Sequence, residues 1–91
     1  MSRANTRSLV KRVAYDGDPL AALSLYEKSI ASGHTRIALL RYMDARDLAV
    51  PLTPRHHAYA HAIANGLSER DMQAIANEAI KRSRERLARR S

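Results

Sequence analysis

The chain contains no cysteine, tryptophan or phenylalanine, and it has only three glycines and three prolines among its 91 residues. Without cysteine it can form neither a disulfide nor a thiolate zinc site, and without a glycine-rich loop it lacks a cradle for nucleotide phosphates. No apolar run approaches the length of a membrane span, and residues 1–7 lack the apolar core of a secretory signal. These absences predict a cytoplasmic protein with no membrane partner.

Side chains suited to catalysis are also scarce. No nucleophile stands at a recognisable spacing from a base, and the histidines at 56, 57 and 61 have no nearby carboxylate to complete a metal shell. The only aromatic residues are four scattered tyrosines, which disfavours a platform for stacking RNA bases. We therefore expect no enzyme, no cofactor, no metal and no small-molecule substrate.

Positive charge is concentrated at the two ends of the sequence, which carries a formal net charge of +7. Residues 1–15 hold four basic side chains and no acid, and residues 77–91 hold six basic side chains against two acids. Basic ends around a neutral body indicate a polyanionic partner. Solubility alone is the alternative explanation of the same pattern.

Residues 16–50 predict two short helices joined by a tight turn. Asp18 can cap the first helix with Pro19 at its first position, and Gly33 suits its end. Thr35 is the expected N-cap of the second helix, which Pro51 is expected to stop. The expected apolar faces consist of Leu20, Ala22, Leu23, Leu25, Tyr26 and Ile30 in the first helix, and of Ile37, Leu40 and either Met43 or Asp44 in the second.

This segment resembles the helix-turn-helix half of ribbon-helix-helix DNA-binding proteins, the fold of the Arc and Met repressors. The residues that carry the resemblance are Asp18-Pro19-Leu20, the run from Ile30 to Arg36 through Ser32-Gly33-His34-Thr35, and Leu39-Leu40-Arg41. It covers residues 7–50 and implies an intertwined homodimer, in which a strand from each chain enters a groove of double-stranded DNA. It also implies a bacterial transcriptional regulator or a mobile-element accessory protein.

On this resemblance, basic N-terminal residues enter the major groove or an AT-rich minor groove, and the amides that open the second helix clamp a phosphate. The implied DNA-binding residues are Arg3, Arg7, Ser8, Lys11, Arg12, His34, Thr35 and Arg36. The basic end of the chain adds non-specific phosphate contacts through Lys81, Arg82, Arg86, Arg89 and Arg90.

Residues 6–15 leave two structures open. A strand would place Arg7, Leu9, Lys11, Val13 and Tyr15 on one face. A short helix that ends at Asp16-Gly17 fits the weak stripe of Leu9, Val10 and Val13 nearly as well. The resemblance favours the strand, so the predicted fold is mostly α, with one N-terminal strand, two helices and two further helices; an all-α bundle of four or five helices is the alternative.

The second half, residues 51–91, is expected to extend the same single domain (1–91) with two helices and a basic tail. Thr53 and Pro54 open one helix that ends at Asn65-Gly66, and Ser68 with Asp71 opens the other. The expected apolar stripe of the last helix consists of Met72, Ile75, Ala76, Ala79, Ile80, Ser83 and Leu87.

Two further resemblances are partial. Leu52-Thr53-Pro54-Arg55, Gly66-Leu67-Ser68 and Ile75-Ala76 look like the opening of a LuxR-type helix-turn-helix, but the turn that would deliver its recognition helix is absent. A single Sel-type helical repeat is suggested by Ala21-Ala22, Leu25-Tyr26, Gly33-His34 and Tyr42. The alternative function is therefore a helical protein–protein interaction module whose basic ends only solubilise it.

Overall fold

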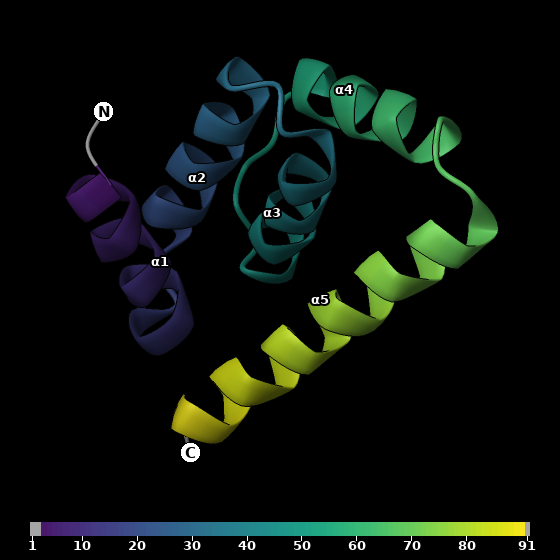
Figure 1. Ribbon diagram of the computed structural model, residues 1–91. Coiled ribbons are helices and arrows are strands. Elements are labelled where there is room, and N and C mark those ends of the chain that lie inside the picture. The colour runs from purple at the N-terminus through teal and green to yellow at the C-terminus, as the bar shows by residue number, and fades with distance from the viewer. Residues whose placement is uncertain (1–2, 91) are drawn as a thin grey trace.

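The computed structural model describes residues 3–90, with side chains described for residues 5–89, and it consists of five α-helices (Figure 1). None of residues 3–90 forms a strand. The helices are α1 (Arg3–Asp16), α2 (Pro19–Ala31), α3 (Thr35–Asp47), α4 (Pro54–Asn65) and α5 (Glu69–Arg90). The mostly helical prediction is confirmed in the form of its all-α alternative.

The strand expected within residues 6–15 is wrong, because this segment lies inside helix α1. Leu9 and Val13 are buried and Lys11 is exposed. A strand would have placed all three on one face and carried the lysine into the core, whereas a helix separates Lys11 from the other two. The burial of Leu9 and Val13 together therefore requires a helix. This helix ends at Asp16, as the helical alternative predicted.

The first three helices end in the same way. A residue one or two positions after the last helical residue has a positive φ: 60° at Gly17, 72° at Gly33 and 57° at Ala49. At each end, the amide of the next residue donates to a carbonyl in the last helical turn, as in Val50 N to Ala45 O at 2.9 Å. This Schellman geometry satisfies carbonyls that would otherwise lack donors. It ends α3 at Asp47, before the predicted stop at Pro51.

Helices α2 and α3 form the expected hairpin. Asp18 caps α2 by accepting hydrogen bonds from the amides of Leu20 at 3.0 Å and Ala21 at 3.2 Å, with Pro19 at the first helical position. The N-cap of α3 is His34 rather than Thr35, and no side chain caps this helix. The predicted cap is thus displaced by one residue, and the first amides of α3 are left without a side-chain acceptor.

Helix α3 lies at the centre of the fold and contacts α2, α4 and α5 (Figure 1). Two apolar clusters meet on it. One joins α1 and α2 to the end of α3 through Leu9, Val13, Ala21, Ala22, Leu25, Ala45 and Val50. The other joins α2, α3 and α4 through Tyr26, Ala38, Leu39, Tyr42 and Ala60. One chain therefore closes a core from its own helices, so the strand-swapped dimer is not needed to bury it.

The C-terminal helices begin as predicted. The hydroxyl of Thr53 accepts the amide of His56 at 3.3 Å, and the ring of His56 accepts the amide of Thr53 at 3.1 Å, which makes a capping box. Ser68 likewise accepts the amide of Asp71 at 3.1 Å.

The apolar stripe expected on α5 is only partly correct. Ile80 and Leu87 are 50% and 64% exposed, whereas Arg86 is 4% exposed. The face of α5 that packs on α3 therefore contains Arg86 in place of Ile80 and Leu87. None of the described helices is both long and apolar enough to cross a membrane.

Candidate anion-binding site

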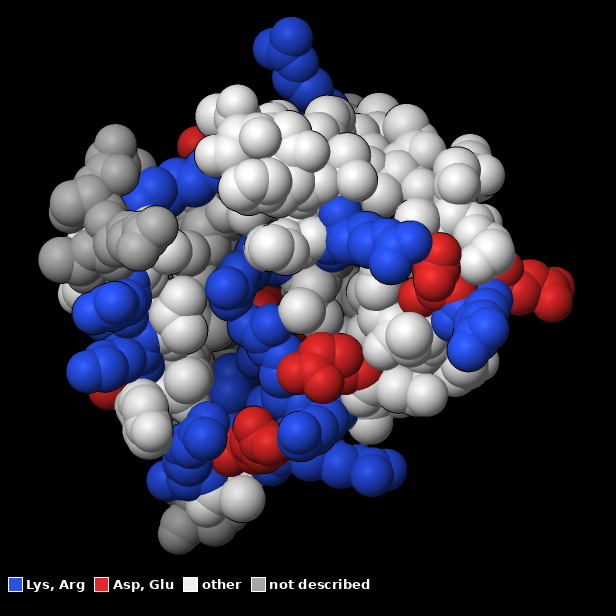
Figure 2. Space-filling view, in the orientation of Figure 1, with Lys and Arg blue, Asp and Glu red and all other residues white. Residues whose placement is uncertain are grey.

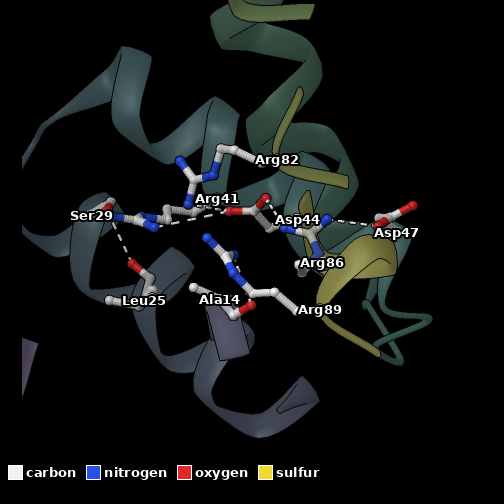
Figure 3. Close-up of polar contacts among 9 residues, drawn as sticks. All are labelled: Ala14, Leu25, Ser29, Arg41, Asp44, Asp47, Arg82, Arg86 and Arg89. Atoms are coloured by element: carbon white, nitrogen blue, oxygen red, sulfur yellow. Dashed lines mark hydrogen bonds and ion pairs between the residues drawn. The ribbon is translucent and has the colours of Figure 1, made fainter. Parts of the chain in front are cut away.

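The buried face of α5 meets α3 through an arginine cluster, which we define as Arg41, Arg82 and Arg86 around the carboxylate of Asp44 (Figure 3). The side chain of Asp44 is 1% exposed. One of its oxygens accepts a hydrogen bond from Arg86 at 2.8 Å, and the other pairs with Arg82 at 2.8 Å. Two guanidinium groups from α5 are thus enough to neutralise this buried carboxylate.

Arg86 also holds a second carboxylate. Its other terminal nitrogen donates to Asp47 at 2.6 Å. Burial alone would lower the pKa of Arg86, but its hydrogen bonds to Asp47 and Asp44 outweigh burial and raise it. The same hydrogen bond from Arg86 lowers the pKa of Asp47. Through its two terminal nitrogens, Arg86 therefore ties α5 to two carboxylates of α3.

Arg41 is the surplus cation of the cluster. Its nearest acid is Asp44, at 3.9 Å, and that oxygen is already paired with Arg82. The Nε and Nη1 atoms of Arg41 are buried and have no hydrogen-bond partner. Burial lowers the pKa of Arg41, repulsion from Arg82 lowers it further, and Asp44 only partly opposes them. Three guanidinium groups thus face the two carboxylates of Asp44 and Asp47.

A hollow of about 240 Å³ opens beside the cluster, between α1 and α5. Arg89 closes one side of it by donating to the carbonyl of Ala14 at 3.1 Å and by stacking over Tyr15, with its guanidinium carbon 4.6 Å from the ring centroid. Figure 2 shows Lys and Arg side chains gathered in and around a depression on this face. The hollow is lined by Val10, Val13, Ala14, Arg41, Glu78, Arg82, Glu85, Arg86 and Arg89.

A second hollow, of about 450 Å³, lies on the other side of Arg41, between α1, α2 and the start of α3. Its described lining holds no carboxylate and consists of Thr6, Leu25, Lys28, Ser29, Ala31, Ser32, His34, Ile37 and Arg41. Figure 3 shows Arg41 between Asp44 and Ser29. Arg41 therefore lines both hollows, and only the first also contains acids.

The predicted DNA-binding residues of the N-terminal segment lie on α1. Arg7, Ser8 and Lys11 are exposed, and neither cation has an ion-pair partner among the described residues. Arg12 is engaged, because its Nε donates to Asp18 at 2.9 Å. The side chain of Arg3 lies outside the described residues. Among the described side chains of α1, Arg7 and Lys11 are thus the cations that remain available to a partner.

The predicted phosphate clamp at the start of α3 is placed at one end of the second hollow, since His34 lines it. Thr35 is exposed and opens the helix. Arg36 extends away from this clamp to pair with Asp71 of α5 at 2.8 Å. The structure therefore separates Arg36 from His34 and Thr35.

The basic residues predicted on α5 fall into three groups. Lys81 is exposed and has no ion-pair partner among the described residues. Arg82 and Arg86 are directed inward to Asp44, and Arg89 contacts Ala14 and Tyr15. The side chain of Arg90 lies outside the described residues. Sequence reasoning did not foresee Asp44, Arg41 and Lys28 as site residues, although the spacing of Arg82 and Arg86 by one helical turn was a visible signal.

Two of the four histidines, His56 and His57, have structural partners. The hydroxyl of Tyr42 shares a hydrogen bond with Nδ1 of His57 at 2.7 Å, and Nε2 of His56 lies 3.4 Å from Glu27. Among the described residues, no three side chains of the His, Cys, Asp or Glu type gather as metal ligands would.

A scan against models of protein families, a search of curated proteins and a search of solved structures found no match to this chain. The resemblances drawn from short motifs therefore stay predictions.

Proposed function

We propose that this protein binds a polyanion, duplex DNA, through the exposed cations of α1 and α5. The observation that carries the proposal is the division of charge in the fold. Arg7 and Lys11 on α1, and Lys81 and Arg84 on α5, are exposed and make no ion pair among the described residues. Most acids, in contrast, are taken up by internal or neighbouring arginines, as at Asp18, Asp44, Asp47 and Asp71.

The two basic helices adjoin one another. Arg89 of α5 donates to the carbonyl of Ala14 and stacks over Tyr15 of α1, so the end of α5 lies against the end of α1 (Figure 1). Arg7 and Lys11 stand one helical turn apart, which suits contacts with successive phosphates along a strand. Because a helix replaces the expected ribbon, these contacts supply affinity that depends on salt rather than base readout by a strand pair.

The test is a titration of fluorescent duplexes, AT-rich and GC-rich, at several salt concentrations. Replacing Arg7 and Lys11 together by glutamine should weaken binding roughly 10- to 100-fold near about 0.1 M salt and reduce the salt slope by about 2, since each lost phosphate contact removes close to one unit. Arg55 and Arg70 form the matched control, because they are also exposed and unpaired among the described residues but lie on α4 and at the start of α5. Equal losses in the two double variants would refute α1 as the contact element.

A separate observation supports the two alternatives, a homodimer and a protein-interaction module. Tyr15, Leu20 and Leu87 are large apolar side chains that are 62%, 71% and 64% exposed. A second copy or another protein could cover them. The mass in solution, measured with and without duplex, separates these cases: a monomer that binds no duplex at low salt would favour the interaction module.

A further inference from the structure

We propose that the hollow between α1, α2 and α3 is a binding site for a phosphomonoester, with Arg41 and Lys28 as its cations. This site is separate from the duplex contacts proposed above, because none of the exposed cations Arg7, Lys11, Lys81 and Arg84 lines it.

The first argument is the unbalanced charge of Arg41. Buried charges in proteins are normally paired and hydrogen-bonded, since an unpaired one is costly. Asp44 balances Arg41 only in part, because the Asp44 oxygen that lies 3.9 Å from Arg41 is 2.8 Å from Arg82. The Nε and Nη1 atoms of Arg41 are buried without a hydrogen-bond partner, and the same side chain lines the neighbouring hollow, where an anion would add the missing negative charge.

The second argument is Lys28, which lines the same hollow. Its Nζ donates to the hydroxyl of Thr6 on α1 at 3.1 Å. Its charge has no carboxylate partner among the described residues. Ser32 adds a hydroxyl group to the lining, whereas the hydroxyl of Ser29 already donates to the carbonyl of Leu25 at 2.9 Å. Two cations and no described acid are typical of oxyanion sites.

The third argument is the start of α3. His34 and Ile37 place the first turn of this helix against the hollow, and no side chain caps it. Amides at a helix N-terminus and the helix dipole favour negative charge. The amides therefore reinforce the cations in selecting an anion.

The size and the apolar part of the lining identify the class of ligand. A hollow of about 450 Å³ exceeds the volume of a phosphate and lies in the range of small-molecule sites, about 300–1,000 Å³. Leu25, Ala31 and Ile37 provide an apolar wall for an organic group attached to the phosphate. Such a group exists in a small sugar phosphate and at the terminal phosphate of a nucleic-acid strand.

The experiment titrates inorganic phosphate, at constant ionic strength, into the whole protein while following the backbone amide resonances of Thr35 and Arg36 and the melting temperature. Phosphate should shift both resonances saturably and raise the melting temperature. Arg41→Gln and Lys28→Gln should each weaken the response at least tenfold. Arg46→Gln is the control, because Arg46 lies on the same helix but is exposed and rests over Tyr42, 5.7 Å from the ring centroid. A wild-type protein that gives no saturable shift would overturn the proposal.

Stability in phosphate-free buffer separates a ligand site from a structural arginine. Arg41→Gln should leave the melting temperature unchanged or raise it, because the variant removes a buried cation that Asp44 does not need. A fall as large as that caused by Asp44→Asn would show that Arg41 serves the fold and would overturn the assignment.

Two further comparisons identify the source of the phosphate and keep the two proposals apart. Tighter binding of a single-stranded oligonucleotide with a 5′-phosphate than of the same strand without it would assign the site to a strand end. Tighter binding of glycerol phosphate than of either oligonucleotide would assign it to a small metabolite, and binding of none of them would refute the site. The Arg7 and Lys11 double variant should keep the phosphate response, and Arg41→Gln should keep duplex binding, so each proposal can fail alone.

Discussion

At the scale of single residues, Asp44 joins two helices. It lies on α3, is 1% exposed, and forms ion pairs with Arg82 and Arg86 of α5. The sequence did not reveal this role, because an aspartate in the middle of a helix looks like a surface residue until its partners, about forty positions later, are placed beside it. The caps at Asp18 and Thr53 were predictable, because their partners lie within three residues.

We expect Asp44→Asn to lower the free energy of unfolding by about 3–5 kcal/mol, because it leaves buried arginines without their counter-charge. Asp47→Asn is the matched variant: it loses a bond to the same Arg86, but its side chain is 44% exposed. Its loss should stay near about 1 kcal/mol or below. Urea denaturation of the two variants measures the difference, and equal losses would contradict the central role of Asp44.

At the scale of elements, helix starts were easier to predict than helix faces and ends. Pro19, Pro54 and Ser68 mark helix starts through interactions with residues a few positions away, which do not depend on tertiary packing. The end of α3 was missed because an alanine, Ala49, occupies the left-handed position that glycine holds at 17 and 33. The nature of α1 was left open because its stripe is weak, and only packing of Leu9 and Val13 on α2 decides it. The buried face of α5 was misjudged because arginines share it.

Ala49→Gly should stabilise the protein by up to about 1 kcal/mol, because a residue with a Cβ is disfavoured at φ 57° and glycine is not. Thermal denaturation of the variant and the wild type measures this gain.

An alanine-to-glycine substitution within a regular helix should instead lower stability. Ala58 is exposed in α4, so Ala58→Gly is expected to cost about 0.5–1 kcal/mol. If both glycine variants were destabilising by the same amount, the left-handed geometry assigned to Ala49 would be wrong.

At the scale of the whole molecule, the core is assembled around α3. Two buried rings, Tyr26 on α2 and Tyr42 on α3, lie with their centroids 5.6 Å apart. Burial raises the pKa of Tyr26 to about 12, and its neighbours Tyr42 and Tyr59 contribute in the same direction. The neutral phenol donates to the carbonyl of His56 at 2.7 Å, which joins α2 to α4. The fold therefore depends on Tyr26 in its protonated form.

This dependence predicts an alkaline limit. An unfolded tyrosine ionises near about pH 10, so the contribution of Tyr26 is complete below that pH and is lost as the pH rises toward its folded pKa of about 12. Denaturation midpoints measured between these values should fall steeply in the wild type and less steeply in Tyr26→Phe. Tyr15 is 62% exposed, so Tyr15→Phe should follow the wild-type curve.

The pairing of Asp44 with the far end of α5 also determines the order in which the structure can form during synthesis. When α1, α2 and α3 have emerged from the ribosome, their apolar contacts can already form, but the arginines at 82 and 86 have not yet emerged. Until then the carboxylate of Asp44 must remain hydrated, and only Arg41 is near enough to accompany it. Arg41 is thus the expected partner of Asp44 in the nascent chain, whereas in the folded protein Arg82 and Arg86 hold this carboxylate at 2.8 Å and Arg41 stays 3.9 Å from it.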